Sequence, residues 1–134
     1  MAIKLREKLN NVDTFTVGSS EIARGKCVVL NSGVVEASGA NSAKFVGVTT
    51  EVGYADRDVL VAGGGSIVLA LAADGDINEG DWLVSDADGK VDTAAAASQG
   101  TAQYFVGYAL KDSSAEDQLI PVVVWPMRVD NPAP

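Results

Sequence analysis

An internal repeat is the feature of this sequence that most constrains its fold. The two copies begin with residues 22–29 (IARGKCVV) and 77–84 (INEGDWLV). Each copy then continues through a hairpin with a glycine, Gly33 in the first copy and Gly89 in the second. An aromatic strand follows, at residues 44–48 and 104–108, and then a last strand that begins at or after an aspartate, Asp58 or Asp117. We expect two related halves, residues 22–67 and 77–125. They should pack into one barrel-like core, because neither half alone can bury both faces of its sheet.

Short strands fill both copies. Runs rich in Val, Ile, Thr, Phe and Tyr are separated by Gly, Asp, Asn and Ser, which is typical of short strands joined by tight turns. Hydrophobic residues make up 47% of the 134 residues and charged residues 21%, so we predict a single compact all-β domain. The predicted strands are residues 14–17, 26–30, 34–37, 44–50, 59–61, 66–71, 81–85, 90–93, 103–110 and 119–124, and residues 93–98 form the one helix-like stretch.

Six glycines mark equivalent points of the repeat. Glycine adopts positive φ without steric cost, which suits the turn before a strand and the tip of a hairpin. Inside a strand, glycine instead marks a bulge or a close approach of two backbones. We predict turn conformations for Gly25, Gly33, Gly80 and Gly89, and a bulge or close approach for Gly47 and Gly107.

The chain contains no histidine and one cysteine, Cys27. This excludes Ser-His-Asp and Cys-His catalysis and histidine metal sites, and we expect Cys27 to be a buried small hydrophobic residue. Residues 86–92 contain alternating aspartates, but their glycine is fourth rather than sixth as an EF-hand loop requires. Residues 63–66 lack the lysine and helix of a phosphate-binding loop. We therefore predict that the protein is not an enzyme and needs no metal or other cofactor.

Lys90 raises one alternative. Biotinyl and lipoyl carrier domains are also duplicated small β folds, and they carry a modified lysine at a hairpin tip. In this chain a glycine separates Asp88 from Lys90, and no methionine precedes the lysine. An ordinary hairpin turn with Asp and Gly accounts for the same residues, and the carrier domain remains the weaker interpretation.

Charge is distributed unevenly along the chain. The net charge is −8, yet residues 58–134 hold 3 basic and 12 acidic side chains, while Lys4, Arg6 and Lys8 cluster near the N-terminus. We expect a basic arm on an acidic body that repels nucleic acid, because DNA binding requires Lys and Arg to replace counterions. The longest apolar stretches are far shorter than the ~20 residues of a membrane helix. No membrane partner and no signal peptide are therefore expected.

The residues of the repeat carry a resemblance to a known family. Residues 77–84 (INEGDWLV), a DADGKV hairpin, an alanine-rich loop, FVGYA at 105–109 and IPVVV at 120–124 are similar to the small capsid cement, or head decoration, proteins of tailed bacteriophages. Residues 22–61 match more weakly, and residues 1–20 are not covered. The resemblance implies a β-barrel or β-tulip fold and no enzymatic activity. It also implies a homotrimer, made in the host cytoplasm, that binds the major capsid protein outside the capsid at threefold or quasi-threefold positions.

The resemblance also directs attention to particular residues. Related proteins use an N-terminal arm to join a capsid sheet, so we expect an arm at residues 1–20, a barrel-like domain at 21–128 and a tail at 129–134. The expected capsid contacts are Lys4, Arg6, Lys8, Phe15 and Val17. The expected oligomer interface is Trp125, Pro126 and Met127, although core packing accounts equally well for Trp125. The predicted function is to cement and stabilise the shell. The alternative from another class is a receptor- or glycan-binding module on a virion or cell surface.

Overall fold

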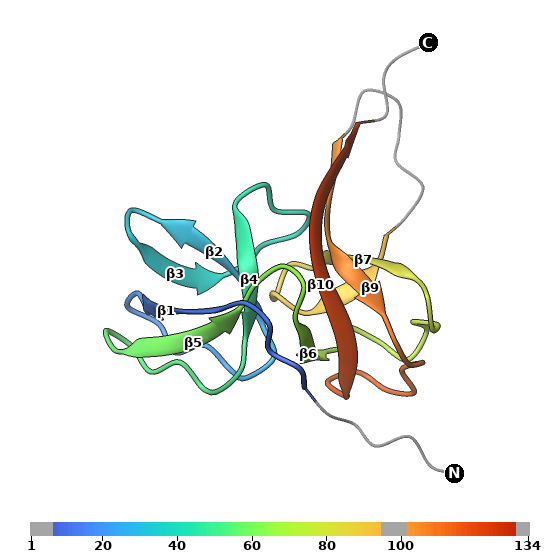
Figure 1. The fold of residues 1–134 in the computed structure, drawn as a ribbon, viewed down its shortest axis with the longest axis horizontal. Coiled ribbons are helices and arrows are strands. Elements are labelled where there is room, and N and C mark those ends of the chain that lie inside the picture. The colour runs from blue at the N-terminus through green and yellow to red at the C-terminus, as the bar shows by residue number, and fades with distance from the viewer. Residues whose placement is uncertain (1–6, 95–101, 131–134) are drawn as a thin grey trace.

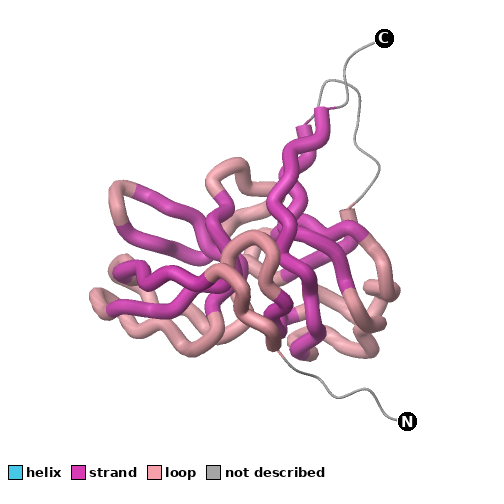
Figure 2. The backbone as a smooth tube through the Cα atoms, viewed as in Figure 1, coloured by secondary structure: helices cyan, strands magenta, loops and turns pink. Residues whose placement is uncertain are grey.

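Two antiparallel five-stranded sheets make up the protein (Figure 1). The computed structural model describes residues 7–94 and 102–130. The first sheet has the order β1-β5-β4-β2-β3 and the second β6-β10-β9-β7-β8. The strands are β1 (Val12–Thr16), β2 (Cys27–Asn31), β3 (Val34–Ala37), β4 (Phe45–Thr49), β5 (Asp58–Ala62), β6 (Ile67–Leu71), β7 (Trp82–Ser85), β8 (Val91–Thr93), β9 (Ala102–Ala109) and β10 (Leu119–Asp130). Strands and loops account for all the described residues (Figure 2), which confirms the predicted all-β fold.

The strand order shows the duplication directly, because adding five to each strand number of the first sheet gives the order of the second. The repeat in space therefore begins at β1 and β6, earlier than the sequence match suggested. Strand β5 pairs with β1 so that Asp58 lies opposite Thr16, and β10 pairs with β6 so that Leu119 lies opposite Leu71. The structural equivalent of Asp58 is thus Leu119 rather than Asp117. This shift of two residues keeps the same face inward, because side chains alternate with period two.

The interior contains two hydrophobic clusters instead of the single core expected from the sequence. One cluster lies within the first half and is built from Val17, Ile22, Val28, Val35, Val59 and Val61. The larger cluster draws most of its side chains from the second half and three, Cys27, Val48 and Ala62, from the first. Strand β2 serves both clusters, since Cys27 and Val28 point to opposite faces and are both fully buried. The halves are therefore joined through a shared cluster.

Backbone hydrogen bonds also connect the halves. The Cys27 N–H donates to the Gly89 carbonyl at 2.7 Å, and the Leu71 N–H donates to the Gly25 carbonyl at 2.9 Å. The Ser38 and Ser85 hydroxyl oxygens lie 2.9 Å apart in a buried hydrogen bond. Buried polar groups must be paired to avoid a desolvation cost, so these contacts favour one relative position of the two sheets.

The chain from residue 7 onward is part of the fold. Strand β1 pairs with β5, and Val17 is fully buried in the first cluster. The Glu7 carboxylate accepts a hydrogen bond from the Leu69 N–H at 3.0 Å and pairs with Arg24 at 3.1 Å. The sequence-based boundary after residue 20 therefore separates β1 and Val17 from the strands with which they pair and pack. Lys4 lies outside the described residues.

Strand β10 continues beyond its predicted end at residue 124, as far as Asp130. It passes Pro126 by a bulge, since its register with β9 shifts between Val124 and Met127. A bulge tolerates proline because it leaves a residue out of the ladder. Together, residues 102–106 of β9 and 125–130 of β10 form what we call the β9–β10 ribbon, which rises from the body in Figure 1.

The turn glycines adopt left-handed conformations, with φ of 80° at Gly25, 87° at Gly33, 86° at Gly80 and 79° at Gly89. Only glycine reaches this region without steric cost from a Cβ atom. Each of the four precedes a strand or lies in a hairpin, so its conformation determines the direction of the strand that follows it.

Candidate interaction surfaces

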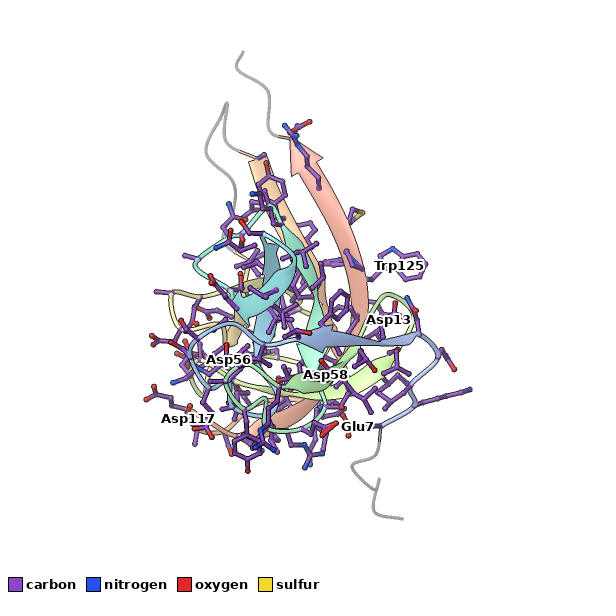
Figure 3. The ribbon with its side chains drawn as sticks, turned by 90° about the vertical axis from the view of Figure 1, so that its left-hand side faces the viewer. Glu7, Asp13, Asp56, Asp58, Asp117 and Trp125 are labelled. Carbon is purple, nitrogen blue, oxygen red and sulfur yellow. The ribbon has the colours of Figure 1, made fainter. Side chains whose placement is uncertain are left out.

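The β9–β10 ribbon exposes apolar side chains. Trp125 is 54% exposed, Met127 38% and Val129 36%, and Pro126 between them is exposed as well. Figure 3 shows the Trp125 side chain pointing away from β10, on the side of the molecule where Asp13 of β1 lies. Exposed aromatic and methionine side chains are typical of the centres of protein interfaces. Of the expected interface residues, the structure thus brings Trp125, Pro126 and Met127 together on one exposed strand.

The base of the ribbon is held by the glycine turn that follows β5. The Gly65 N–H donates to the Val124 carbonyl at 2.8 Å, and the Val124 N–H donates to the Ser66 carbonyl at 2.8 Å. The Gly63 N–H bonds to the Asn11 carbonyl at 2.7 Å, which ties the start of β1 to the same turn. The turn therefore positions β10 where the bulge begins.

The ribbon also carries a balanced pair of charges. The Arg128 guanidinium lies 5.7 Å from the centre of the Tyr104 ring and 2.8 Å from a carboxylate oxygen of Asp130. The hydrogen bond to Asp130 and its charge raise the pKa of Arg128, so it stays protonated. Beside this pair lies a hollow of about 440 Å³, lined by Ser42, Ala43, Phe45, Tyr104, Phe105, Pro126, Met127 and Arg128.

The outer edge of β9 is covered by a loop of the first half. The Asn41 amide accepts a hydrogen bond from the Tyr104 N–H at 2.8 Å and donates to the Ala102 carbonyl at 3.0 Å. On the other side of the ribbon, residues 125–130 make no backbone hydrogen bond except to β9 among the described residues. The ribbon therefore presents one covered edge and one open edge.

The expected capsid contacts near the N-terminus are scattered. Lys4 and Arg6 lie outside the described residues, and Lys8 is exposed while its backbone bridges to Ile67. Phe15 is partly buried against the first cluster, and Val17 is fully buried. The Val17 side chain is thus unavailable for a contact outside its own subunit, because it fills the core beneath β1.

Trp82 and Phe45, two other aromatic residues, are not fully buried. Trp82 is 38% exposed, and its ring lies 5.3 Å from both the Phe105 and the Tyr108 rings. Phe45 is partly buried against the larger cluster. Sequence reasoning also missed Arg128, Val129 and Asn41. Arg128 and Val129 continue the alternation of Met127, but the last strand was predicted to end at residue 124.

The two side chains with candidate chemistry are both held by the fold. Burial raises the pKa of the Cys27 thiol to about 12, with Asp86 adding to the effect, so a thiolate is disfavoured. The Lys90 ammonium lies 2.8 Å from Asp117 and 2.9 Å from Glu116, whose hydrogen bonds raise its pKa. A swinging carrier arm needs a free lysine, whereas Lys90 is paired with these two carboxylates. In residues 7–94 and 102–130 no three His, Cys, Asp or Glu side chains are grouped so as to hold a metal.

Comparison with protein-family models identifies a related family. A family model described as phage cement protein matches residues 8–124. This range begins before β1 and ends within β10, so it spans both sheets. The search of curated proteins found no match. Over the described part of the chain, no helix has the length and apolar character needed to cross a membrane.

Proposed function

The chain belongs to the phage cement protein family, and from this premise we propose that it binds the outer surface of a bacteriophage capsid and stabilises the shell. Membership gives it a structural role in the phage particle. We further propose that its partner is the major capsid protein and that it acts as a homotrimer. The observation that carries the proposal is the family match over residues 8–124, because it extends across both duplicated halves.

The contacts that connect the two halves suit this role. A protein that binds only the mature lattice stabilises that lattice by mass action, and many equivalent sites make modest affinity per subunit effective. The shared cluster and the hydrogen bonds between the sheets hold the two halves in one arrangement. A rigid protein loses little conformational entropy when it binds, so more of the contact energy is available to hold neighbouring capsid subunits.

We propose that the N-terminal basic residues contribute to capsid contact. Lys8 is exposed at the start of the described chain, and Lys4 and Arg6 precede it in the sequence. Phe15 is a weaker candidate because it is partly buried, and the fully buried Val17 is no longer proposed as a contact. Positive side chains increase the rate of encounter with an acidic surface, and this contribution falls as salt rises.

Co-sedimentation tests the proposal. Capsids of the parent phage are prepared without this protein, in both the expanded and the unexpanded form, and each is mixed with the purified protein. We expect saturable binding to the expanded shell and a higher temperature of shell disruption once sites are filled. Absence of the protein from the capsid pellet at all ratios would contradict the proposal. Binding to a glycan array without any capsid would instead favour a receptor-binding module.

A further inference from the structure

The β9–β10 ribbon has no counterpart in the first half of the duplicated fold. Val12 pairs with Ala62, and Ile67 pairs with Val123, so Ala62 and Val123 are equivalent positions. After Ala62 the chain leaves the sheet at the glycine turn, whereas after Val123 strand β10 continues to Asp130. The second half therefore carries an extension that the first half lacks.

The extension adds little to the core of its own subunit. From residue 125 to residue 130 every side chain of β10 is exposed, although three of them are the large apolar Trp125, Met127 and Val129. A two-stranded ribbon is marginally stable in water without a third strand or a packed face. Exposed apolar side chains on such a ribbon are the expected signature of a surface that is covered in an assembly.

The edges of the ribbon indicate which side is covered. Asn41 occupies the β9 edge through its bonds to Tyr104 and Ala102. Among residues 7–94 and 102–130, no strand pairs with the second edge of β10 beyond Val124, and the exposed Trp125 and Met127 lie along the same strand. Unpaired strand edges bind other chains readily. We therefore expect a second molecule to contact the ribbon at β10 and not at β9.

The charges of the ribbon favour another copy of this chain as that molecule. The protein carries a net charge of −8, so most contacts between two copies meet like-charge repulsion. Within the ribbon the charged side chains are Arg128 and Asp130, which pair at 2.8 Å and cancel. Two copies can meet at the ribbon without repulsion between like charges of the ribbon. The apolar side chains of each copy can then cover those of the other.

We propose that copies of this protein associate through the β10 side of the β9–β10 ribbon, with Trp125, Met127 and Val129 packed between subunits. This inference rests on the proposed homo-oligomer and identifies the surface that forms it. Buried tryptophans are often the residues that contribute most to an interface. The ribbon then becomes stable as part of the oligomer, and the body remains free to contact the capsid.

The first test is the mass in solution. Native mass spectrometry and light scattering over a range of concentrations compare the wild type with the double variant Trp125→Ser, Met127→Ser. We expect the variant to associate about tenfold more weakly or worse, while its circular dichroism spectrum is unchanged. The matched control is Tyr54→Ser, because Tyr54 is 57% exposed and lies in the first half. The control should keep the wild-type mass.

A cross-link tests the same surface without weakening it. Val129→Cys should form a covalent dimer under mild oxidation, in solution or on capsids, because Val129 of neighbouring copies is expected to lie close together. The native Cys27 is buried with its pKa raised to about 12, so it should not react. Leu60→Cys serves as the control, since Leu60 is 42% exposed on β5, away from the ribbon. Equal cross-linking of both variants would overturn the proposal.

The outcomes separate this inference from the proposed function. If the wild type binds capsids but the ribbon variant keeps its mass and Val129→Cys gives no covalent dimer, the inference is wrong and cementing stands. If the ribbon variant keeps its mass and loses capsid binding, the ribbon contacts the capsid protein, which also overturns the inference. If the wild type binds no capsid, the proposed function fails whatever its mass.

Discussion

Two strand glycines, Gly47 and Gly107, lie against a carbonyl oxygen at equivalent points of the two halves. A Cβ atom added to Gly47 would lie 2.3 Å from the Ala62 oxygen, and one added to Gly107 would lie 1.8 Å from the Val123 oxygen. Ala62 and Val123 are themselves equivalent in the strand pairing. The repeat therefore preserves a close backbone approach, and this explains why both copies keep glycine in the aromatic strand.

Replacing either glycine by alanine is expected to destabilise the protein strongly. The obstruction is backbone, which cannot move aside without breaking the ladder, so we expect a loss of about 3 kcal/mol or more in the free energy of unfolding. Gly107→Ala should be the worse of the two, because its φ of 153° adds strain to the contact. Urea denaturation measures the loss. Gly33→Ala is the control: its φ is 87° but no atom lies within 4 Å of the added Cβ, so about 1 kcal/mol is expected.

Asp92 gives a pH dependence with a definite sign. Burial raises the pKa of this carboxyl, and the negative charges of Asp74, Asp86 and Asp76 add to the effect, against a lowering hydrogen bond from the Thr93 N–H. The folded state thus holds the proton more tightly than the unfolded state. The Asp92 contribution to stability therefore rises as pH falls through the raised folded pKa, and it is a penalty at neutral pH.

Asp92→Asn should accordingly raise the melting temperature at neutral pH. The amide oxygen can still accept the hydrogen bond from the Thr93 N–H, now 2.8 Å long, while the charge of the partly buried carboxylate is removed. The advantage over the wild type should shrink from neutral to acidic pH, because Asp92 itself becomes neutral as the pH falls through its raised pKa. Thermal melts at both pH values measure this, with Asp88→Asn as a control for charge removed from the neighbouring hairpin. If the advantage of Asp92→Asn over the wild type grew on acidification, the pKa of Asp92 would not be raised in the folded state.

At the scale of the elements, the N-terminal segment shows how a strand and its neighbours depend on one another. Strand β1 completes the first sheet, and the Glu7 carboxylate satisfies the Leu69 N–H on the outer edge of β6. The Lys8 and Ile67 backbones exchange hydrogen bonds of 2.9 and 2.8 Å. Covering edges in this way prevents unwanted strand pairing.

A truncated protein that starts at Ser20 is therefore expected to fold poorly. It loses the edge strand β1, exposes β5 and leaves the first cluster without Val17. A protein that starts at Glu7 keeps all these contacts and should melt within a few degrees of the full chain. Circular dichroism melts of both variants check this expectation. Comparable melting of the Ser20 variant would show that β1 contributes little to stability, and weaker capsid binding by the Glu7 variant would support a contact made by Lys4 and Arg6.

The positions of the strands could be predicted from the sequence, and their pairing could not. All ten strands were located, most to within a residue or two, because glycine and aspartate turns separate short β-branched runs. The order of strands depends on long-range pairing that no local pattern records. The end of β10 was missed because Pro126 normally terminates pairing, and only the bulge allows the strand to continue.

The candidate site was predictable only in part for the same reason. Trp125 and Met127 were identified from their residue types, but the role of Asn41 at the β9 edge depends on a contact across 63 residues of sequence. Val17 was proposed as an exposed contact because its segment reads as a free strand. Its burial follows from packing beneath the first sheet, which the alternation of residues 14–17 alone does not specify.

At the scale of the whole molecule, the shared cluster determines whether the two halves unfold together. Cys27, Val48 and Ala62 of the first half are buried among side chains of the second. Both tryptophans, Trp82 and Trp125, belong to the second sheet. Their fluorescence therefore reports on the second half, while the far-ultraviolet circular dichroism signal reports on both sheets.

Val48→Ala is expected to destabilise both sheets although Val48 lies in β4 of the first. Removing two buried methyl groups from a packed cluster costs about 2 kcal/mol, which lowers the melting temperature of a domain of this size by roughly 6–12 °C. Because the cluster is shared, the tryptophan fluorescence and circular dichroism midpoints should fall together. Val35→Ala is the control, since Val35 is fully buried in the cluster confined to the first half. If Val48→Ala lowered the circular dichroism midpoint and left the fluorescence midpoint in place, the halves would be independent folding units.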